Sequence, residues 1–317
     1  MELEFNRDES GVAMTVWSRR ELLARAGMGA AAAWMAPGLL VRTMWAEEPH
    51  PVISPLNKLT DEDEIALGKR FSEELEKELT VIENPLIDRY LGGMVKALAA
   101  QSQRPDLPYS IKLVNSHVPN AASLPGGFLY LNRGLVEMIQ TEGEMVATLA
   151  HEIGHVVGRH TVNHILAELH ARAMLKPVLD NLQSNPGVVN QIILKLGGAV
   201  AMLAAMHFSR KDELEADLLG FYEVLRAGWD PHAFLELFAR FDALEKASGQ
   251  VQIPFLSDHP PTPQRLEAIR RELTQVQVPA NAANDSMKFK VFKAAMTILP
   301  EPPKKPQPQE QPSPQGY

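Results

Sequence analysis

The feature that most constrains this chain is a five-residue pattern, H-E-x-x-H, at His151 to His155. It follows an apolar run, Met145 to Ala150, that favours a helix. Thr141 can cap such a helix, and the acidic residues of its first turn suit the helix dipole. Because no proline lies between Pro125 and Pro177, we predict a helix that carries the whole pattern.

The spacing of the two histidines indicates a metal site. Residues four apart are about one helical turn apart, so His151 and His155 project from the same face, roughly 5–6 Å apart. Their nitrogens can then reach one Zn²⁺ at about 2.0–2.1 Å each. Glu152 lies beside that position, where it can accept a proton from a zinc-bound water. Gly154, in the same helix, permits another segment to approach the site closely.

A third metal ligand has to come from elsewhere in the chain. The extended pattern H-E-x-x-H-x-x-G-x-x-H fails, since its last position is Thr161 and His160 falls one residue short. A second helix offers Glu213, and Asp217 shares its face four residues on. Asp217 can accept a hydrogen bond from the far nitrogen of a ligand histidine and so fix its ring. Glu215 points elsewhere on that helix and is the alternative ligand.

Four segments of the chain resemble, in the same order, a family of membrane-associated zinc peptidases that includes HtpX, the CAAX prenyl proteases and the periplasmic BepA-like proteases. The resemblance covers the chain from about Thr60 to Glu272. The segments carry the patterns N-A-x-x-x-P-G-G, H-E-x-x-H, S-R-x-x-E-x-x-A-D and H-P-x-x-x-x-R. They are Asn120–Tyr130, Leu149–His160, Ser209–Asp217 and His259–Leu266.

The resemblance implies a fold and a set of roles. The fold is α+β, a mainly helical gluzincin-type zinc peptidase domain with a small β-sheet at the edge of the active site. His151, His155 and Glu213 would bind one Zn²⁺ per chain. Glu152 would be the general base, and Asp217 would orient a ligand from behind.

His259 has two readings. It is a turn residue before two prolines, or it lies near the metal, where it stabilises the transition-state oxyanion or occupies the open metal position as a gate. The resemblance favours a place near the metal. Arg265 would anchor the same loop by pairing with a carboxylate.

The Asn120–Leu131 segment would lie at the edge of the site as a strand. An edge strand can add an extended substrate as a further strand, and backbone pairing accepts many sequences. By resemblance, Asn120 and Ala121 supply the backbone contacts to the substrate. An ordinary edge strand followed by a Pro-Gly-Gly turn is the other interpretation, and the two are compatible.

Further histidines form a second pair four residues apart, His160 and His164, with Glu168 one turn further on. Three ligands stacked along one helix converge poorly on one ion, so local hydrogen bonding is the favoured interpretation and a second metal the alternative.

Residues 1–46 have the features of a signal or anchor segment. Ser18 to Leu23 resembles a twin-arginine export motif, and a moderately apolar stretch follows from Ala26 to Val41. Ala46 is a possible cleavage position, although Met44 departs from the small-residue pattern. An uncleaved anchor in the inner membrane is the alternative. In either case we expect the catalytic part to face the periplasm.

The rest of the chain divides into a linker at 47–59, a zinc metallopeptidase domain at 60–275, a C-terminal extension at 276–299 and a disordered Pro/Gln-rich tail at 300–317. An apolar insert, Val188 to Met206, would be a helix that covers the core, or else a lid or membrane-surface element beside the cleft. We predict two strands in the domain, at Tyr109–Val114 and Gly127–Leu131. The predicted helices, besides the one at the motif and the one at Glu213, are Thr60–Leu79, Pro85–Ala100, Val162–Leu182 and Pro231–Leu244.

Composition narrows the function further. The chain has no cysteine, which excludes disulfides, thiolate metal ligands and a thiol nucleophile. Its net charge of −8 and the lack of a basic face argue against nucleic acid as a partner. We expect protein or peptide substrates and association with a membrane surface. The oligomeric state does not follow from the sequence.

The sequence therefore predicts a zinc metalloendopeptidase that hydrolyses unfolded or misassembled envelope proteins. Two other classes stay open. One is a latent, zinc-bound chaperone or assembly factor that binds extended segments, and the other is a zinc hydrolase of a non-peptide substrate. The intact Glu152 argues against the first, and the strand beside the site argues against the second.

Overall fold

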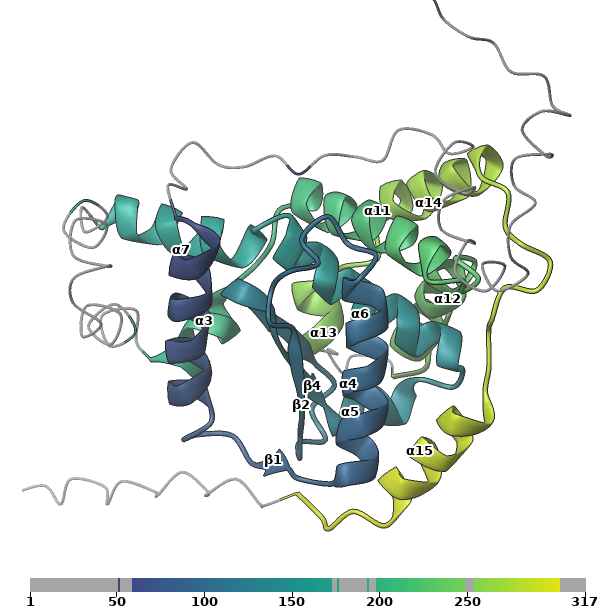
Figure 1. Ribbon diagram of the computed structural model, residues 1–317, viewed down its shortest axis with the longest axis horizontal. Helices are drawn as coiled ribbons and strands as arrows, with labels where there is room; N and C mark the ends of the chain where they lie inside the picture. The colour runs from purple at the N-terminus through teal and green to yellow at the C-terminus, as the bar shows by residue number, and fades with distance from the viewer. Residues whose placement is uncertain are drawn as a thin grey trace, which may run out of the picture. The chain divides into compact units, whose positions relative to one another are not determined.

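The computed structural model describes residues 59–172, 198–248 and 254–302, together with residues 51, 176 and 193. Helices predominate, and four strands form one mixed sheet in the order β1-β2-β4-β3 (Figure 1). The α+β, mainly helical fold expected from the sequence is therefore confirmed. No helix among the described residues is both long and apolar enough to span a membrane.

The first and last strands in this order lie at the two edges of the sheet. Strands β2 (Ser110–Val114) and β4 (Phe128–Asn132) run parallel, while β1 (Val81–Ile82) pairs antiparallel with β2. The edge strand β3 (Ala121–Leu124) pairs antiparallel with β4 on one side only. Both predicted strands are found within a residue of their expected bounds, whereas the short β1 was not predicted.

The turn between β3 and β4 needs glycine. Pro125–Gly127 forms a 3₁₀ turn in which Gly126 has φ 75° and Gly127 has φ 95°. A Cβ on Gly126 would lie 2.6 Å from the Cα of Ile65 on helix α3 (Asp61–Leu75). The turn therefore lies directly against α3, which fixes where β3 begins and ends relative to the rest of the domain.

The sheet separates two hydrophobic cores, because successive side chains of a strand point to opposite faces. Leu129 and Leu131 of β4 pack into the larger core with helices α4 (Pro85–Ala99) and α6 (Glu142–Val157). Tyr130, between them, packs into the smaller core with α3 and α7 (His160–Ala171).

Helix α6 is the centre of the domain. Every residue from Glu142 to Val157 is buried, and the Thr141 side chain caps the first turn as expected. Helix α11 (Arg210–Arg226) crosses α6 closely at two glycines. A Cβ on Gly154 would lie 2.3 Å from the backbone oxygen of Ala216, and one on Gly220 would lie 2.8 Å from the backbone of Ala150. This crossing holds the two helices that carry the motif residues at a fixed separation.

The remaining helices complete the domain and its C-terminal extension. They are α5 (Arg133–Met138), α10 (Ala199–Ala205), α12 (Ala233–Ser248), α13 (Pro254–Asp258), α14 (Pro263–Gln275) and α15 (Met287–Thr297). Helix α15 lies against α4 (Figure 1).

Some predicted helix bounds differ from the structure. The first helix begins after Thr60, with a capping box, but ends at Leu75 and not at Leu79. The chain has to turn there, because the backbone oxygen of Thr80 accepts from Asn115 as the chain enters β1. The whole signal segment lies outside the described residues. So do most of the linker and the tail, and large parts of the Val162–Leu182 helix and the Val188–Met206 insert.

Candidate metal centre and cleft

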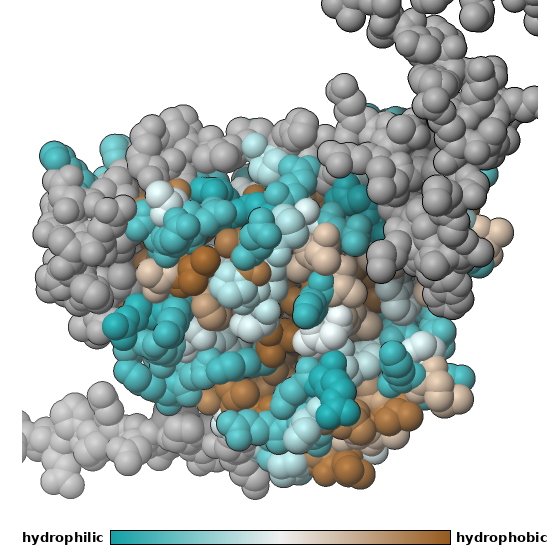
Figure 2. Space-filling view, in the orientation of Figure 1, coloured by the Kyte–Doolittle hydropathy of each residue, from teal (hydrophilic) through white to brown (hydrophobic). Residues whose placement is uncertain are grey.

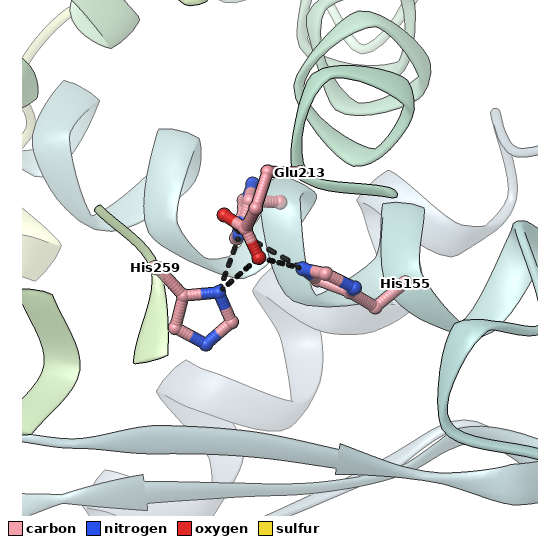
Figure 3. Close-up of side chains that lie close together, drawn as sticks. His155, Glu213 and His259 are labelled. Carbon is pink, nitrogen blue, oxygen red and sulfur yellow. Dashed lines mark hydrogen bonds and ion pairs between the residues drawn. The ribbon is translucent and has the colours of Figure 1, made fainter. Parts of the chain in front are cut away.

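Three separate parts of the fold bring four buried side chains together. Helix α6 supplies His151 and His155, α11 supplies Glu213, and the residue after α13 is His259. One ligand atom from each lies within 4.8 Å of the other three. Figure 3 shows the His155, Glu213 and His259 side chains pointing toward one another.

The separations between these atoms are those of a tetrahedral metal site. Nε2 of His151 lies 3.0 Å from Nε2 of His155 and 3.1 Å from Nδ1 of His259. The Glu213 carboxylate lies 2.9 Å from His259, 3.4 Å from His155 and 3.6 Å from His151. Four ligands around Zn²⁺ at about 2.0–2.1 Å would lie about 3.3 Å apart. The donor set of three imidazole nitrogens and one carboxylate oxygen also suits zinc, so the residues fit the ion that the sequence implies.

Electrostatics favour metal binding at two of the donors, His155 and Glu213. Burial, the largest influence on His155, holds its pKa well below the ordinary value, so this ring is neutral. Burial acts to raise the pKa of Glu213, but His259 and the two motif histidines outweigh it and hold that pKa far below its ordinary value. A neutral imidazole and an ionised carboxylate are the protonation states that bind a metal.

Asp217 and Arg265 support the donors from behind. Oδ1 of Asp217 lies 2.9 Å from Nδ1 of His151, so this carboxylate can orient the ring. The Arg265 guanidinium donates to both Asp217 oxygens, at 2.6 and 2.8 Å, and lies 2.8 Å from Glu213. Burial alone would raise the pKa of Asp217, but Arg265 outweighs it and lowers that pKa.

Arg265 also holds the loop that carries His259. Its Nη1 donates to the backbone oxygens of His259, at 3.2 Å, and Pro260, at 3.0 Å. One buried guanidinium thus links the α11 carboxylates to the loop.

Glu152 faces a cleft beside the donors. The side chain is buried, yet neither carboxylate oxygen has a hydrogen-bond partner among the described residues. Its Oε1 lies 3.7 Å from Nε2 of His259. Together with His259 it lines a cleft of about 200 Å³ along β3, whose other walls are largely apolar. A buried carboxylate without a partner is costly, so Glu152 is a candidate to contact a group that enters the cleft.

The sheet edge forms one wall of this cleft. Asn120, Ala121, Ala122 and Ser123 all line it. The Asn120 side chain accepts from the backbone N–H of Ala121 at 2.9 Å and donates to Asp258 at 3.3 Å. An extended chain that paired with this edge would have to displace the Asn120 side chain from the Ala121 N–H.

The two histidines of the second pair, His160 and His164, lie on α7 in different surroundings. Nδ1 of His160 is hydrogen-bonded to Nδ1 of His155, and Nε2 of His160 faces Glu215 at 3.6 Å and Asp212 at 3.9 Å. His164 is absent from the groups of possible metal ligands among the described residues. Glu215 belongs to the group at His160, and not to the one at Glu213.

One contact of the site has no signal in the sequence. The ring of Phe208 stacks on His155 with centroids 4.1 Å apart and also lines the cleft. Phe208 precedes the Ser209–Asp217 segment and carries no motif position, so only the packing of the chain before α11 reveals it. The contact between His160 and His155 likewise depends on the break between α6 and α7, where Arg159 takes φ 58°.

Comparison with known proteins gives consistent matches. A family model described as Peptidase family M48 matches residues 85–273. Mitochondrial metalloendopeptidase OMA1 of Schizosaccharomyces pombe is 31% identical over 189 residues, which are 60% of this chain and 54% of that protein. The beta-barrel assembly-enhancing protease of Escherichia coli is 26% identical over 231 residues, 68% of this chain and 44% of that protein. The chain thus spans about half the length of these relatives.

Proposed function

This chain is a metallopeptidase of family M48, and we propose on that premise that it is a zinc-dependent endopeptidase with one Zn²⁺ per chain. His151, His155 and Glu213 would hold the ion. The observation that carries the proposal is the tetrahedral spacing of these donors and His259 beside the unpartnered Glu152.

The ion and the protein would divide the chemistry. When bound, zinc would polarise the scissile carbonyl and lower the pKa of a water to about 7. Glu152 would accept the proton of the attacking water and then deliver it to the leaving amine. Asp217 would keep His151 in the tautomer with the proton on Nδ1, because its oxygen lies 2.9 Å from that nitrogen.

His259 would act as a gate in the resting protein. Its Nδ1 lies within hydrogen-bonding distance of both His151 and Glu213, where it takes the fourth donor position. A substrate carbonyl would need that position, so His259 would have to swing aside. Once displaced, its ring could donate a hydrogen bond to the developing oxyanion.

The substrates would be extended segments of unfolded or misassembled envelope proteins. Support comes from the β3 edge that lines the cleft, with Asn120 and Ala121 as the backbone contacts, and from the twin-arginine-like segment that would direct the chain to the periplasm. The relative in Escherichia coli is named for enhancing β-barrel assembly, which makes outer-membrane proteins in assembly a substrate class to test.

A second function rests on one specific observation. Because His259 completes the donor set, the resting chain could bind extended segments without cleaving them, as a latent zinc-bound chaperone or assembly factor. The same experiment separates the two functions.

The test is cleavage of an unfolded protein such as β-casein by the zinc-loaded full chain, read by mass spectrometry of the fragments. Glu152→Gln should lower cleavage about 10²–10⁴-fold and keep its zinc, because the amide cannot accept a proton. Glu236→Gln, an exposed position on α12, is the matched control. Equal cleavage by wild type and Glu152→Gln would refute the proposed base. Binding of casein without cleavage by either would favour the chaperone.

A further inference from the structure

A second hollow lies between α4 and α15 and shares no lining residue with the catalytic cleft. Its volume is about 1130 Å³, and its walls are mainly apolar. On α4 it is lined by Leu86, Gly93 and Ala97, which share one helix face, and the small side chains of the last two leave the space open. On α15 it is lined by Met287 and Val291.

Helix α15 is apolar on two opposite sides. One side packs into the domain through Phe289, Phe292 and Met296, and Tyr90 of α4 stacks on Phe292 with centroids 4.5 Å apart. An apolar side of a helix is normally covered by packing. The outer side of α15 is not, so it requires an explanation.

The outer side carries three of the five large apolar residues that are exposed among those described. Met287, Val291 and Ile298 follow the i, i+4, i+11 spacing of one face and are 71%, 48% and 81% exposed. Leu86, across the groove, is 42% exposed, which leaves Val118 as the fifth large exposed apolar residue among those described. Figure 2 shows hydrophobic surface gathered at the lower right, over α15 and the start of α4. An apolar patch of this kind marks an interaction site.

Lysines flank the outer stripe of α15. Lys288 and Lys290 are exposed, flank the outer stripe and belong to a helix with no acidic residue, in a chain whose net charge is −8. Arg89 lines the groove from α4. Acidic groups lie nearby as well: Glu142 lines the groove and accepts from the Tyr90 hydroxyl, and the exposed Asp285 accepts from the backbone N–H of Glu142.

We propose that the α4–α15 groove is the surface on which this protein docks to an anionic lipid bilayer. Apolar side chains flanked by lysines, on a helix lying flat, are what an interfacial membrane helix presents. Lys288, Lys290 and Arg89 would contact lipid phosphates, and the stripe from Met287 to Ile298 would enter the acyl boundary. The proposal concerns attachment alone and is independent of the peptidase chemistry.

The absence of cysteine allows one site to be followed at a time. Met287→Cys in the zinc-loaded full chain would carry an environment-sensitive fluorophore, and Lys69→Cys, on an exposed position of α3, would carry the same label as control. Each protein would be mixed with vesicles of phosphatidylcholine alone or with phosphatidylglycerol, with brominated lipids in a parallel set. We expect a shift to shorter wavelength and quenching at 287 on anionic vesicles, a much weaker response on neutral ones, and neither signal at 69.

Charge variants test the electrostatic part. Lys288→Gln with Lys290→Gln in the labelled background should weaken binding to anionic vesicles roughly twenty-five-fold at low salt. Lys69→Gln with Lys246→Gln removes the same charge elsewhere and should leave binding unchanged.

Three results would overturn the proposal. Equal signals at 287 on neutral and anionic vesicles would remove the role of charge. No signal at 287 on bound protein would mean that another part of the chain makes the attachment. A short-wavelength emission at 287 before lipid is added would mean that a second copy or another segment of the chain covers the groove.

Discussion

Nδ1 of His160 lies 2.9 Å from Nδ1 of His155, between two buried rings. If Nε2 of His155 binds a metal, the proton of this ring is on Nδ1 and His160 accepts it. An imidazole that accepts at Nδ1 carries its proton on Nε2, and in His160 that atom faces Glu215 at 3.6 Å and Asp212 at 3.9 Å. While His155 binds a metal in this way, His160 has no lone pair for a second ion. The hydrogen bond thus argues for a support role and against a second metal at His160.

We predict that His160→Phe weakens zinc binding about 10–100-fold, because it removes the acceptor that fixes the tautomer of His155. The phenyl ring preserves most of the packing, so the fold should be kept. The measurement is zinc affinity by competition with a chromogenic chelator, with circular dichroism to check the fold. His164→Gln, on the same helix, is the control, and an unchanged zinc affinity in His160→Phe would rule out the support role.

Asp217→Asn should destabilise the metal-free protein by about 3–5 kcal/mol near neutral pH, because Arg265 is left buried and half-paired. The pKa of Asp217 is lowered in the folded state, so its contribution is present above the ordinary value of 3.8 and is lost as pH falls below it.

Urea unfolding of the metal-free chains between about pH 6 and pH 3 measures this effect. The difference between wild type and Asp217→Asn in the free energy of unfolding should shrink as the pH falls. Asp242→Asn, on an exposed ion pair of α12, should show a small difference throughout. A difference that stays constant with pH would show that Asp217 does not titrate as proposed.

The sequence predicted what depends on local spacing. The helix around His151 and the shared face of Glu213 and Asp217 follow from helical periodicity, and the positions of β2 and β4 follow from patterning. Contacts between segments far apart in the sequence could not be predicted from local patterns. Phe208 reaches His155 only through the packing of the chain before α11, and no local pattern gives the place where α15 lies on α4.

We predict that Gly154→Ala disrupts the α6–α11 crossing, because its Cβ would lie 2.3 Å from the backbone oxygen of Ala216, which cannot move alone. The variant should unfold at lower temperature and lose zinc affinity together, since the crossing sets where Glu213 lies. Gly92→Ala, on α4 with no atom within 4 Å of the added Cβ, should instead stabilise by about 0.5–1 kcal/mol. Thermal melts and zinc titrations of both variants provide the comparison, and a neutral Gly154→Ala would contradict the close crossing.

We predict that His259→Ala raises the rate of casein cleavage several-fold, because the fourth donor position is then open to a substrate carbonyl. Zinc affinity should fall in the same variant, since one donor is lost. His207→Ala, an exposed histidine 3.7 Å from Asp258, is the control. A fall in turnover with unchanged substrate affinity would instead assign His259 to oxyanion stabilisation alone.

The edge strand β3 has a consequence for the protein's own solubility. An open sheet edge that accepts extended chains can also recruit identical copies, which is how edge-to-edge aggregation begins. Here the Asn120 side chain occupies the N–H of Ala121, and Thr161 donates to the carbonyl of Ser123. Two side chains therefore occupy backbone groups of β3 that would otherwise be open to another strand. A second copy of the chain has to displace them before it can pair with this edge.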